Sequence, residues 1–332
     1  MKKLLYLSVL IFTTKIILAC DICGCFMGIL PYDNQSNIAF FHRYRIFNGY
    51  YAAHQRGVFF PSGSYRVMHG NHTEPTVDTS KKYLSSDYES YKNYEFRIKW
   101  FIHPRIEINA ILPFLEIRSR EDTIQIQHFG LSDPTFLIGY HLIKKIYEEK
   151  FQHRLILYSG IKIPSGNYYD KDQWGKRIPL LSQPGTGSVD YSIGLTYIIG
   201  YKKLGSMINL NYKINGKNYY KEKIANSITL NHFLFYKIKL KNLIFVPSWQ
   251  NYYEYTKGLY INNTLVNGTT MNVWLSGLGC DWTYKNIQLT TAWQWRVYEA
   301  HTADALKNKG RFIIGLTYNF NQKKYLIKSD KE

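Results

Sequence analysis

The chain repeats short segments in which apolar and polar residues alternate, and this period of two is the feature that most restricts its fold. Between Tyr94 and Ile102 the even-numbered residues are aromatic or aliphatic, while Glu95, Arg97 and Lys99 stand at odd positions. Successive side chains of a β-strand point to opposite faces. Each such segment is therefore predicted to be a strand with one apolar face and one polar face.

The connections between these strands alternate in length. One unit reads strand (135–142), short charged turn, strand (153–163), long polar loop, strand (191–199). This alternation is typical of transmembrane β-barrels, which have an even number of antiparallel strands, short periplasmic turns and long outer loops. The long connections are predicted at 48–90, 119–132, 164–187, 215–222, 257–270 and 300–310.

The whole chain predicts an all-β fold, an antiparallel transmembrane barrel of roughly twelve strands with a polar interior. Because every long connection follows an odd-numbered strand, both ends of the barrel chain are expected on the periplasmic side. The expected strands are 38–46, 94–102, 106–112, 135–142, 153–163, 191–199, 208–214, 224–236, 243–255, 272–283, 287–298 and 311–320.

Composition agrees with a barrel in a membrane. Aromatic residues make up 17% of the chain, including 30 Tyr, and membrane interfaces favour Tyr and Trp. The mean hydropathy of −0.30 fits strands of which only every second residue meets lipid. The net charge of +18 comes from Lys and Arg spread over turns, loops and alternate strand positions. With no nucleic-acid-binding motif in the chain, we interpret this charge as attraction to lipid headgroups or simple solvation, and expect no nucleic-acid partner.

The predicted segments of the chain follow from these patterns. Residues 1–19 have two lysines and an apolar run and are expected to be a signal peptide. Residues 20–36 form a cysteine-rich periplasmic segment, 37–320 the outer-membrane barrel, and 321–332 a basic periplasmic tail. The expected location is the cell outer membrane, with outer-membrane lipid, a small-molecule solute and the barrel assembly machinery as partners.

The alternation also predicts which side chains line the lumen and which meet lipid. Ile98, Leu210, Leu289 and Leu316 fall on the apolar face and are expected in lipid. Polar residues at the opposite positions are expected to line the lumen: Arg97, Lys99, Glu107, Asn109, Asn209, Asn211, Lys213, Gln288, Gln294 and Arg296.

Three cysteines near the start, Cys20, Cys23 and Cys25, form a C-x-x-C-x-C pattern. Three thiolates so close together would suit Cu(I), or Zn(II) with a fourth ligand. The alternative is a disulfide among them, or lipidation of Cys20, because an exported chain enters an oxidising compartment. Apart from this Cu or Zn site, no cofactor is expected.

Three segments resemble a known family: Gly130-Leu-Ser-Asp-Pro134, Gly160-Ile-Lys-Ile-Pro-Ser-Gly166 and Leu181-Ser-Gln-Pro-Gly-Thr-Gly-Ser-Val-Asp190. They resemble the outer-membrane transporters grouped under the meta-pathway of phenol degradation. The start at Cys20-Asp-Ile-Cys-Gly-Cys25 resembles the version found in Bacteroidetes. The resemblance implies passage of small hydrophobic or aromatic compounds. The tail after the last strand departs from such barrels. We interpret the three segments themselves as turns at the barrel rim.

Three functions compete at this stage. The leading one is an outer-membrane channel or transporter for small molecules, with no enzymatic activity. The second is a metal-binding or sensing protein anchored by the barrel and working through its N-terminal cysteines. The third is an outer-membrane hydrolase with a serine–histidine pair around Ser159 or His232, although no catalytic motif such as G-x-S-x-G or H-E-x-x-H occurs.

Overall fold

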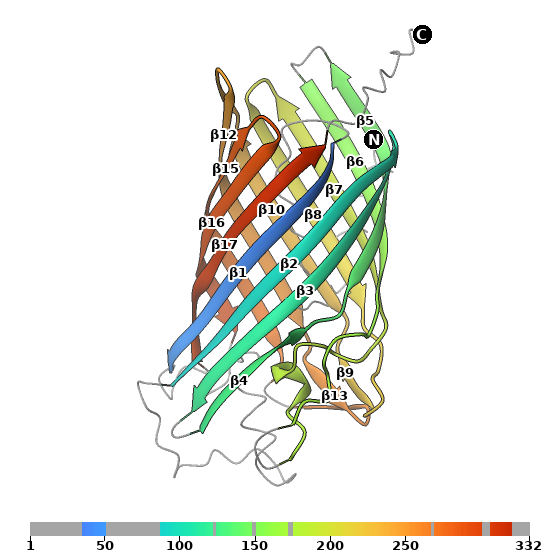
Figure 1. Cartoon of the computed structure of the whole chain (residues 1–332), viewed down its shortest axis with the longest axis vertical. Helices are drawn as coiled ribbons and strands as arrows, with labels where there is room; N and C mark the ends of the chain where they lie inside the picture. The colour runs from blue at the N-terminus through green and yellow to red at the C-terminus, as the bar shows by residue number, and fades with distance from the viewer. Residues whose placement is uncertain are drawn as a thin grey trace, which may run out of the picture.

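The structure is a computed structural model that describes residues 35–50, 87–121, 124–147, 151–171, 175–266, 269–300 and 306–320. Twelve antiparallel strands close into a barrel, and Figure 1 shows them strongly tilted around its axis. Closure is made by β1 with β17, where Ser36 pairs with Phe320, and by β10 with β12. The predicted fold class and strand number are confirmed.

The wall strands are β1 (Ser36–Tyr50), β2 (Tyr88–His103), β3 (Ile106–Glu121), β5 (Thr135–Tyr147), β6 (Phe151–Lys162), β7 (Asp190–Tyr201), β8 (Leu204–Ile214), β10 (Ser227–Tyr236), β12 (Leu243–Thr256), β15 (Met271–Tyr284), β16 (Ile287–Ala300) and β17 (Leu306–Phe320). Short strands β4 (Ile124–Leu131) and β11 (Ile238–Leu240) pair with β3 and β12. Outside the barrel sheet, β9 (Glu222–Ile224), β13 (Leu259–Ile261) and β14 (Thr264–Leu265) form a small sheet at the long-loop end (Figure 1).

The short turns are tight because their residues tolerate a left-handed backbone. Lys202 and Lys285, each the first residue of a two-residue turn, have φ of 53° and 52°. Such φ values allow the turn twist that matches two antiparallel strands. These turns lie at the same end as Ser36 and Phe320, which pair with each other.

Burial separates the two faces of the wall. The lipid-type residues Ile98, Leu210, Leu289 and Leu316 are 47%, 41%, 39% and 54% exposed. Within the described residues, no helix is long and apolar enough to cross a membrane.

Two expectations differ from the structure. Residues 119–132 were expected to be a long loop, but β3 extends to Glu121 and β4 pairs with it from Ile124 to Leu131. The interior is also not uniformly polar. One buried cluster, in the half of the lumen nearer the short turns, is apolar. Its members are Ala39, Phe41, Phe233, Phe235, Ile244, Val246, Ala292 and Ile313. The alternation of apolar and polar residues cannot predict this cluster, because the strands that contribute to it carry apolar residues on both faces.

Candidate functional site: a filled lumen

Five buried residues, here called the loop anchor, come together from separate parts of the wall. Lys162 ends β6, Asp190 begins β7 and Lys213 lies on β8. Asp133 lies in the break between β4 and β5, two strands that pair in succession with β3. Thr186 belongs to the connection between β6 and β7.

The charges of the loop anchor neutralise one another. Lys162 Nζ lies 2.8 Å from Asp133 Oδ2 and 2.7 Å from Asp190 Oδ2. Lys213 Nζ lies 2.9 Å from Asp190 Oδ2. All four side chains are at most 4% exposed. Removing one partner of such a buried ion pair is strongly destabilising, because it leaves a buried charge without compensation.

The anchor holds residues 163–171 and 175–189, here together called the inward segment. Thr186 donates to Asp133 Oδ2 from its amide at 2.8 Å and from its hydroxyl at 2.7 Å. Gly166 N donates to Asp133 Oδ1 at 3.0 Å. A Cβ atom on Gly185 would lie 2.6 Å from the Gly166 carbonyl carbon, so only glycine fits there. The segment is therefore held both by backbone amides and by the Thr186 hydroxyl.

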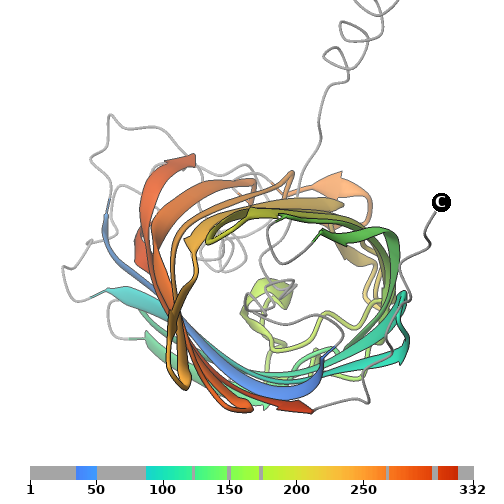
Figure 2. The same cartoon turned by 90° about the horizontal axis from the view of Figure 1, so that it is seen from above.

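The part of the inward segment around Leu180–Ser182 lies inside the barrel, in the half of the lumen nearer the long loops. Figure 2 shows its yellow-green part, near residue 180, inside the ring of strands. There the 3-10 helix Leu180–Ser182 is buried, and its leucines pack in an apolar cluster with residues of β1, β9, β12, β13, β15 and β17. The members are Phe47, Leu180, Leu181, Ile224, Tyr252, Leu259, Met271, Val273, Leu275 and Leu306.

Side chains also meet across the lumen. Arg45 of β1 lies 3.9 Å from Glu254 of β12, although β17, β16 and β15 separate these strands along the wall. Tyr252 donates to Glu254 at 2.6 Å, and the guanidinium of Arg311 lies 3.9 Å from the centre of the Tyr252 ring. The barrel is therefore spanned by side chains at this level.

A second charged cluster lies nearer the short turns, around Glu107. Its carboxylate is 2.8 Å from Lys99 Nζ and 3.1 Å from His141 Nε2. Tyr158 donates to it at 2.6 Å and Asn109 at 3.2 Å. A buried carboxylate with this many partners is fixed in place, which favours a structural role in the wall.

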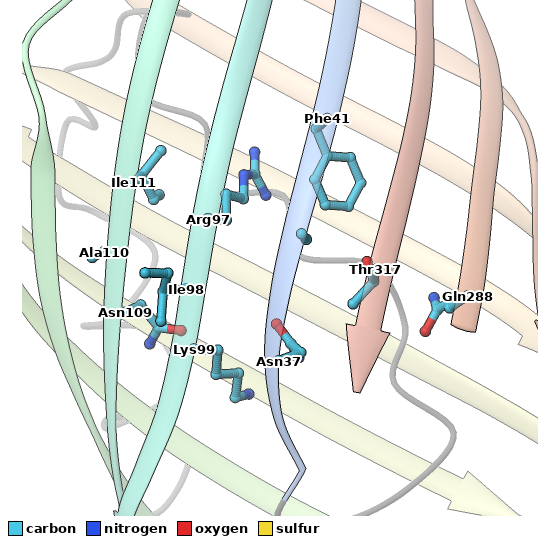
Figure 3. Close-up of a pocket in the computed structure, with 11 residues that line it drawn as sticks. Asn37, Phe41, Arg97, Ile98, Lys99, Asn109, Ala110, Ile111, Gln288 and Thr317 are labelled. Carbon is cyan, nitrogen blue, oxygen red and sulfur yellow. The ribbon is translucent and has the colours of Figure 1, made fainter. Parts of the chain in front are cut away.

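A pocket remains beside these clusters on the inner wall of β1, β2, β3, β16 and β17 (Figure 3). Figure 3 shows Arg97, Lys99 and Asn109 on neighbouring strands, with Phe41 opposite Arg97. The guanidinium of Arg97 lies 4.6 Å from the Phe41 ring centre. The pocket is lined by cationic, amide and aromatic groups. Its lining also includes Asn37, Ala39, Ile111, Gln288 and Thr317.

The sequence-predicted lumen residues have these environments. Asn209 and Arg296 are partly buried; Asn209 Nδ2 donates to Thr196 at 2.7 Å, and Arg296 Nη1 lies 3.4 Å from Glu299. The other eight are at most 9% exposed: Arg97, Lys99, Glu107, Asn109, Asn211, Lys213, Gln288 and Gln294. The structure brings Arg97, Lys99, Asn109 and Gln288 to the pocket of Figure 3 and Lys213 to the loop anchor.

In its described residues, the structure gives no support to the proposed metal site or to the proposed serine–histidine pair. Cys20, Cys23 and Cys25 lie outside the described residues, so metal binding there stays a prediction. The described ranges contain no group of three or more His, Cys, Asp and Glu that could hold a metal ion. Ser159 is exposed, and His232 Nε2 lies 3.2 Å from Ser206 Oγ instead. A serine–histidine contact does not by itself make a hydrolase, since a catalytic histidine is oriented by a third group.

The loop anchor was missed by sequence reasoning. Asp133, Lys162, Thr186 and Asp190 all lie within the three segments that were interpreted as rim turns. These four residues do lie at or between strand ends, but the interpretation did not predict that they are at most 5% exposed and in contact with one another. The three segments each contain Gly together with Asp, Lys or Thr, which could have indicated a shared site. Which of these residues contact one another can be known only from the barrel register.

A closed antiparallel barrel with long loops at one end and short turns at the other defines the class of outer-membrane β-barrels. The chain belongs to the family described as "Putative MetA-pathway of phenol degradation", whose model matches residues 84–312. The predicted family and the outer-membrane location are thereby confirmed.

A solved outer-membrane channel shares the fold. The COG4313 outer membrane channel from Pseudomonas putida F1 is 11% identical, with a TM-score of 0.60 over 90% of this chain and 99% of that one. The β domain of the Bordetella autotransporter BrkA is 10% identical, with a TM-score of 0.45 over 87% of this chain and 100% of that one. The search of curated proteins found no match.

Adjacent residues on β2 provide a direct check of the two faces. We expect a cysteine at Lys99 to react with a water-soluble maleimide, because Lys99 lines the pocket of Figure 3. A fluorophore attached to a cysteine at position 98 should instead be quenched by lipid-phase quenchers, because the Ile98 side chain is 47% exposed on the outward face. Both are measured in proteoliposomes with the native cysteines replaced. Lipid-phase quenching at position 99 would contradict the assignment of faces.

Proposed function

We propose that the protein is a narrow outer-membrane passage for small, weakly polar molecules, with hydrophobic and aromatic compounds as the preferred class. One observation carries this proposal: the part of the inward segment around Leu180–Ser182 lies in the half of the lumen nearer the long loops, and the segment is held there by the loop anchor. Barrels of sixteen or more strands leave an aqueous channel, whereas smaller ones can be filled by side chains. In this proposal the chain moves solutes without transforming them, and assembly machinery remains a predicted partner.

The lining suits solutes of low charge. The carboxylates of Asp133, Asp190 and Glu107 are paired with Lys162, Lys213 and Lys99, so these groups present little net charge to a passing ion. Apolar clusters occupy both the outer and the inner half of the lumen. The family description, which concerns phenol degradation, agrees with this solute class.

The long-loop end of the barrel adds a group of aromatic rings, of which Tyr169, Tyr219 and Tyr220 are exposed. Tyr168, Tyr169, Tyr219 and Tyr220 form edge-to-face contacts with ring centres 5.4 to 6.2 Å apart. Arg177 supports them, because its guanidinium lies 4.0 Å from the Tyr220 ring centre and pairs with both oxygens of Glu222. Such rings offer π-faces to an aromatic solute before it enters.

Cells that carry the chain in their outer membrane test this proposal. We expect faster uptake of an uncharged aromatic fluorescent probe than in cells without it. Liposomes containing the purified chain should, in contrast, swell little in disaccharide solutions, because the filled lumen excludes large polar solutes. Rapid disaccharide swelling with no gain in aromatic uptake would show a general pore and contradict the proposal.

A further inference from the structure

The outward wall of β1 to β4 carries a group of aromatic side chains that we call the aromatic wall. Neighbouring rings have centres 5.0 to 6.5 Å apart. They lie on the same face as the lipid-type residues Ile98 and Ile102. The members are Phe40, Tyr94, Phe96, Phe114 and Phe129.

Charged residues begin on this face where the apolar band ends. From Ile102, beside the short turn, to Lys92 is ten positions (102 − 92) on β2. At about 3.3 Å per residue and a tilt of about 35–45°, this corresponds to roughly 25 Å of height, the thickness of the apolar band of such barrels. Lys92 pairs in register with Glu116 of β3. Both therefore lie at the outer border of the membrane.

We call Lys92, Glu116, Arg118 and Arg120 the headgroup patch. Lys92 Nζ lies 3.4 Å from Glu116, and Arg118 donates to the same carboxylate. The side chains of Lys92 and Arg118 are 27% and 41% exposed, while Glu116 is 10% exposed between them. Three cations and one carboxylate leave a net charge of +2 (3 − 1). Glu116 thus holds two cations close together without neutralising the patch.

Most of the described wall lacks this arrangement, although β17 carries Lys307 and Lys309 at outward positions near the long loops. On β7, β8, β10, β12, β15 and β16 the outward positions nearest the long loops carry uncharged side chains. They include Tyr191, Ile214, Ile228, Tyr253, Tyr255, Trp274 and Tyr298. Outward charge near the long loops is therefore concentrated on the side formed by β17, β1, β2 and β3, and only on β2 and β3 does a carboxylate, Glu116, hold two cations together in the described wall.

We propose that the aromatic wall and the headgroup patch together bind a phosphorylated glycolipid of the outer leaflet. Lys92, Arg118 and Arg120 would contact the phosphate, because arginine and lysine form strong charge-assisted hydrogen bonds with phosphate oxygens. The acyl chains would lie along Phe96, Phe114 and the neighbouring rings. This site lies outside the lumen, so the proposal does not depend on the solute that the barrel carries.

Binding of lipid A to the purified barrel in nanodiscs of zwitterionic lipid tests the site. The patch variant is Lys92→Gln/Arg118→Gln/Arg120→Gln. The matched control is Lys176→Gln/Lys217→Gln/Lys221→Gln, which removes three exposed lysines of the outer loops. We expect diphosphorylated lipid A to bind the patch variant at least about tenfold more weakly than the wild type and the control.

Lipid A without phosphate should bind all three proteins equally weakly. The proposal is overturned if the patch variant keeps wild-type affinity, if the control loses as much, or if dephosphorylated lipid A binds as tightly as the diphosphorylated form. It is also overturned if inorganic phosphate alone competes fully at comparable concentration, since the patch would then be a simple anion site. Heat-dependent gel mobility confirms that each variant is a folded barrel.

Discussion

Lys162→Met should release the inward segment and raise the single-channel conductance several-fold. The substitution removes the amine that contacts both Asp133 and Asp190, leaving two buried carboxylates with Lys213 alone beside them. Breaking a buried ion pair in this way costs about 3–5 kcal/mol. Because Thr186 and Gly166 are bound to Asp133, the segment is the part of the structure that this cost would displace. Planar bilayer recordings measure the result.

Two further variants separate loss of the anchor from loss of a charge. Lys176→Met removes an exposed lysine of the same segment and should leave conductance unchanged. Asp133→Asn/Lys162→Met restores the charge balance and keeps an acceptor for Thr186, so it should return conductance toward the wild type. If Lys162→Met conducts like the wild type, the loop anchor does not hold the lumen closed.

Ile98→Arg should destabilise the barrel by about 2–4 kcal/mol in lipid vesicles, because a guanidinium at mid-depth in the bilayer is poorly solvated. Ile98 lies on the outward face and is 47% exposed, about six residues from the turn at Pro104–Arg105. Denaturant titration of the folded barrel measures the free energy of unfolding.

The matched control is Leu204→Arg, on the same outward face but directly after the turn at Lys202–Lys203. Near the interface the cost falls to about 0–1 kcal/mol. An inward arginine is a poor control because the lumen is packed, as at Val246, which is 1% exposed. If arginine lowers the free energy of unfolding equally at positions 98 and 204, Ile98 does not lie at mid-depth in the lipid bilayer.

The sequence was sufficient for the wall, since the alternation at Tyr94–Ile102 determines which side chains point outward and where the strands run. Local patterns succeed there because a one-residue slip would invert every side chain. The same patterns failed for 119–132, where polar and charged residues such as Arg120 and Gln125 were interpreted as a loop although they pair in an extended hairpin.

The site could not be predicted to the same degree. The pairing of Asp133 with Lys162 joins residues 29 positions apart, and the contact of Arg45 with Glu254 joins two strands that three other strands separate. These contacts depend on the barrel register, which the local sequence pattern does not contain. Buried Leu180 and Leu181 are the local hint that this loop has an apolar environment.

Cross-linking of the inward segment to the wall tests most directly whether the lumen is filled. Leu181 and Leu275 belong to one buried cluster, so cysteines at these two positions, with the native cysteines replaced, should be joined by a short bifunctional thiol reagent in the membrane-embedded protein. Cysteines at Val273 and Glu299, which pair on adjacent strands, serve as the positive control. A linked 181–275 peptide found by mass spectrometry is the predicted result. A linked control with no 181–275 link would place the segment outside the lumen.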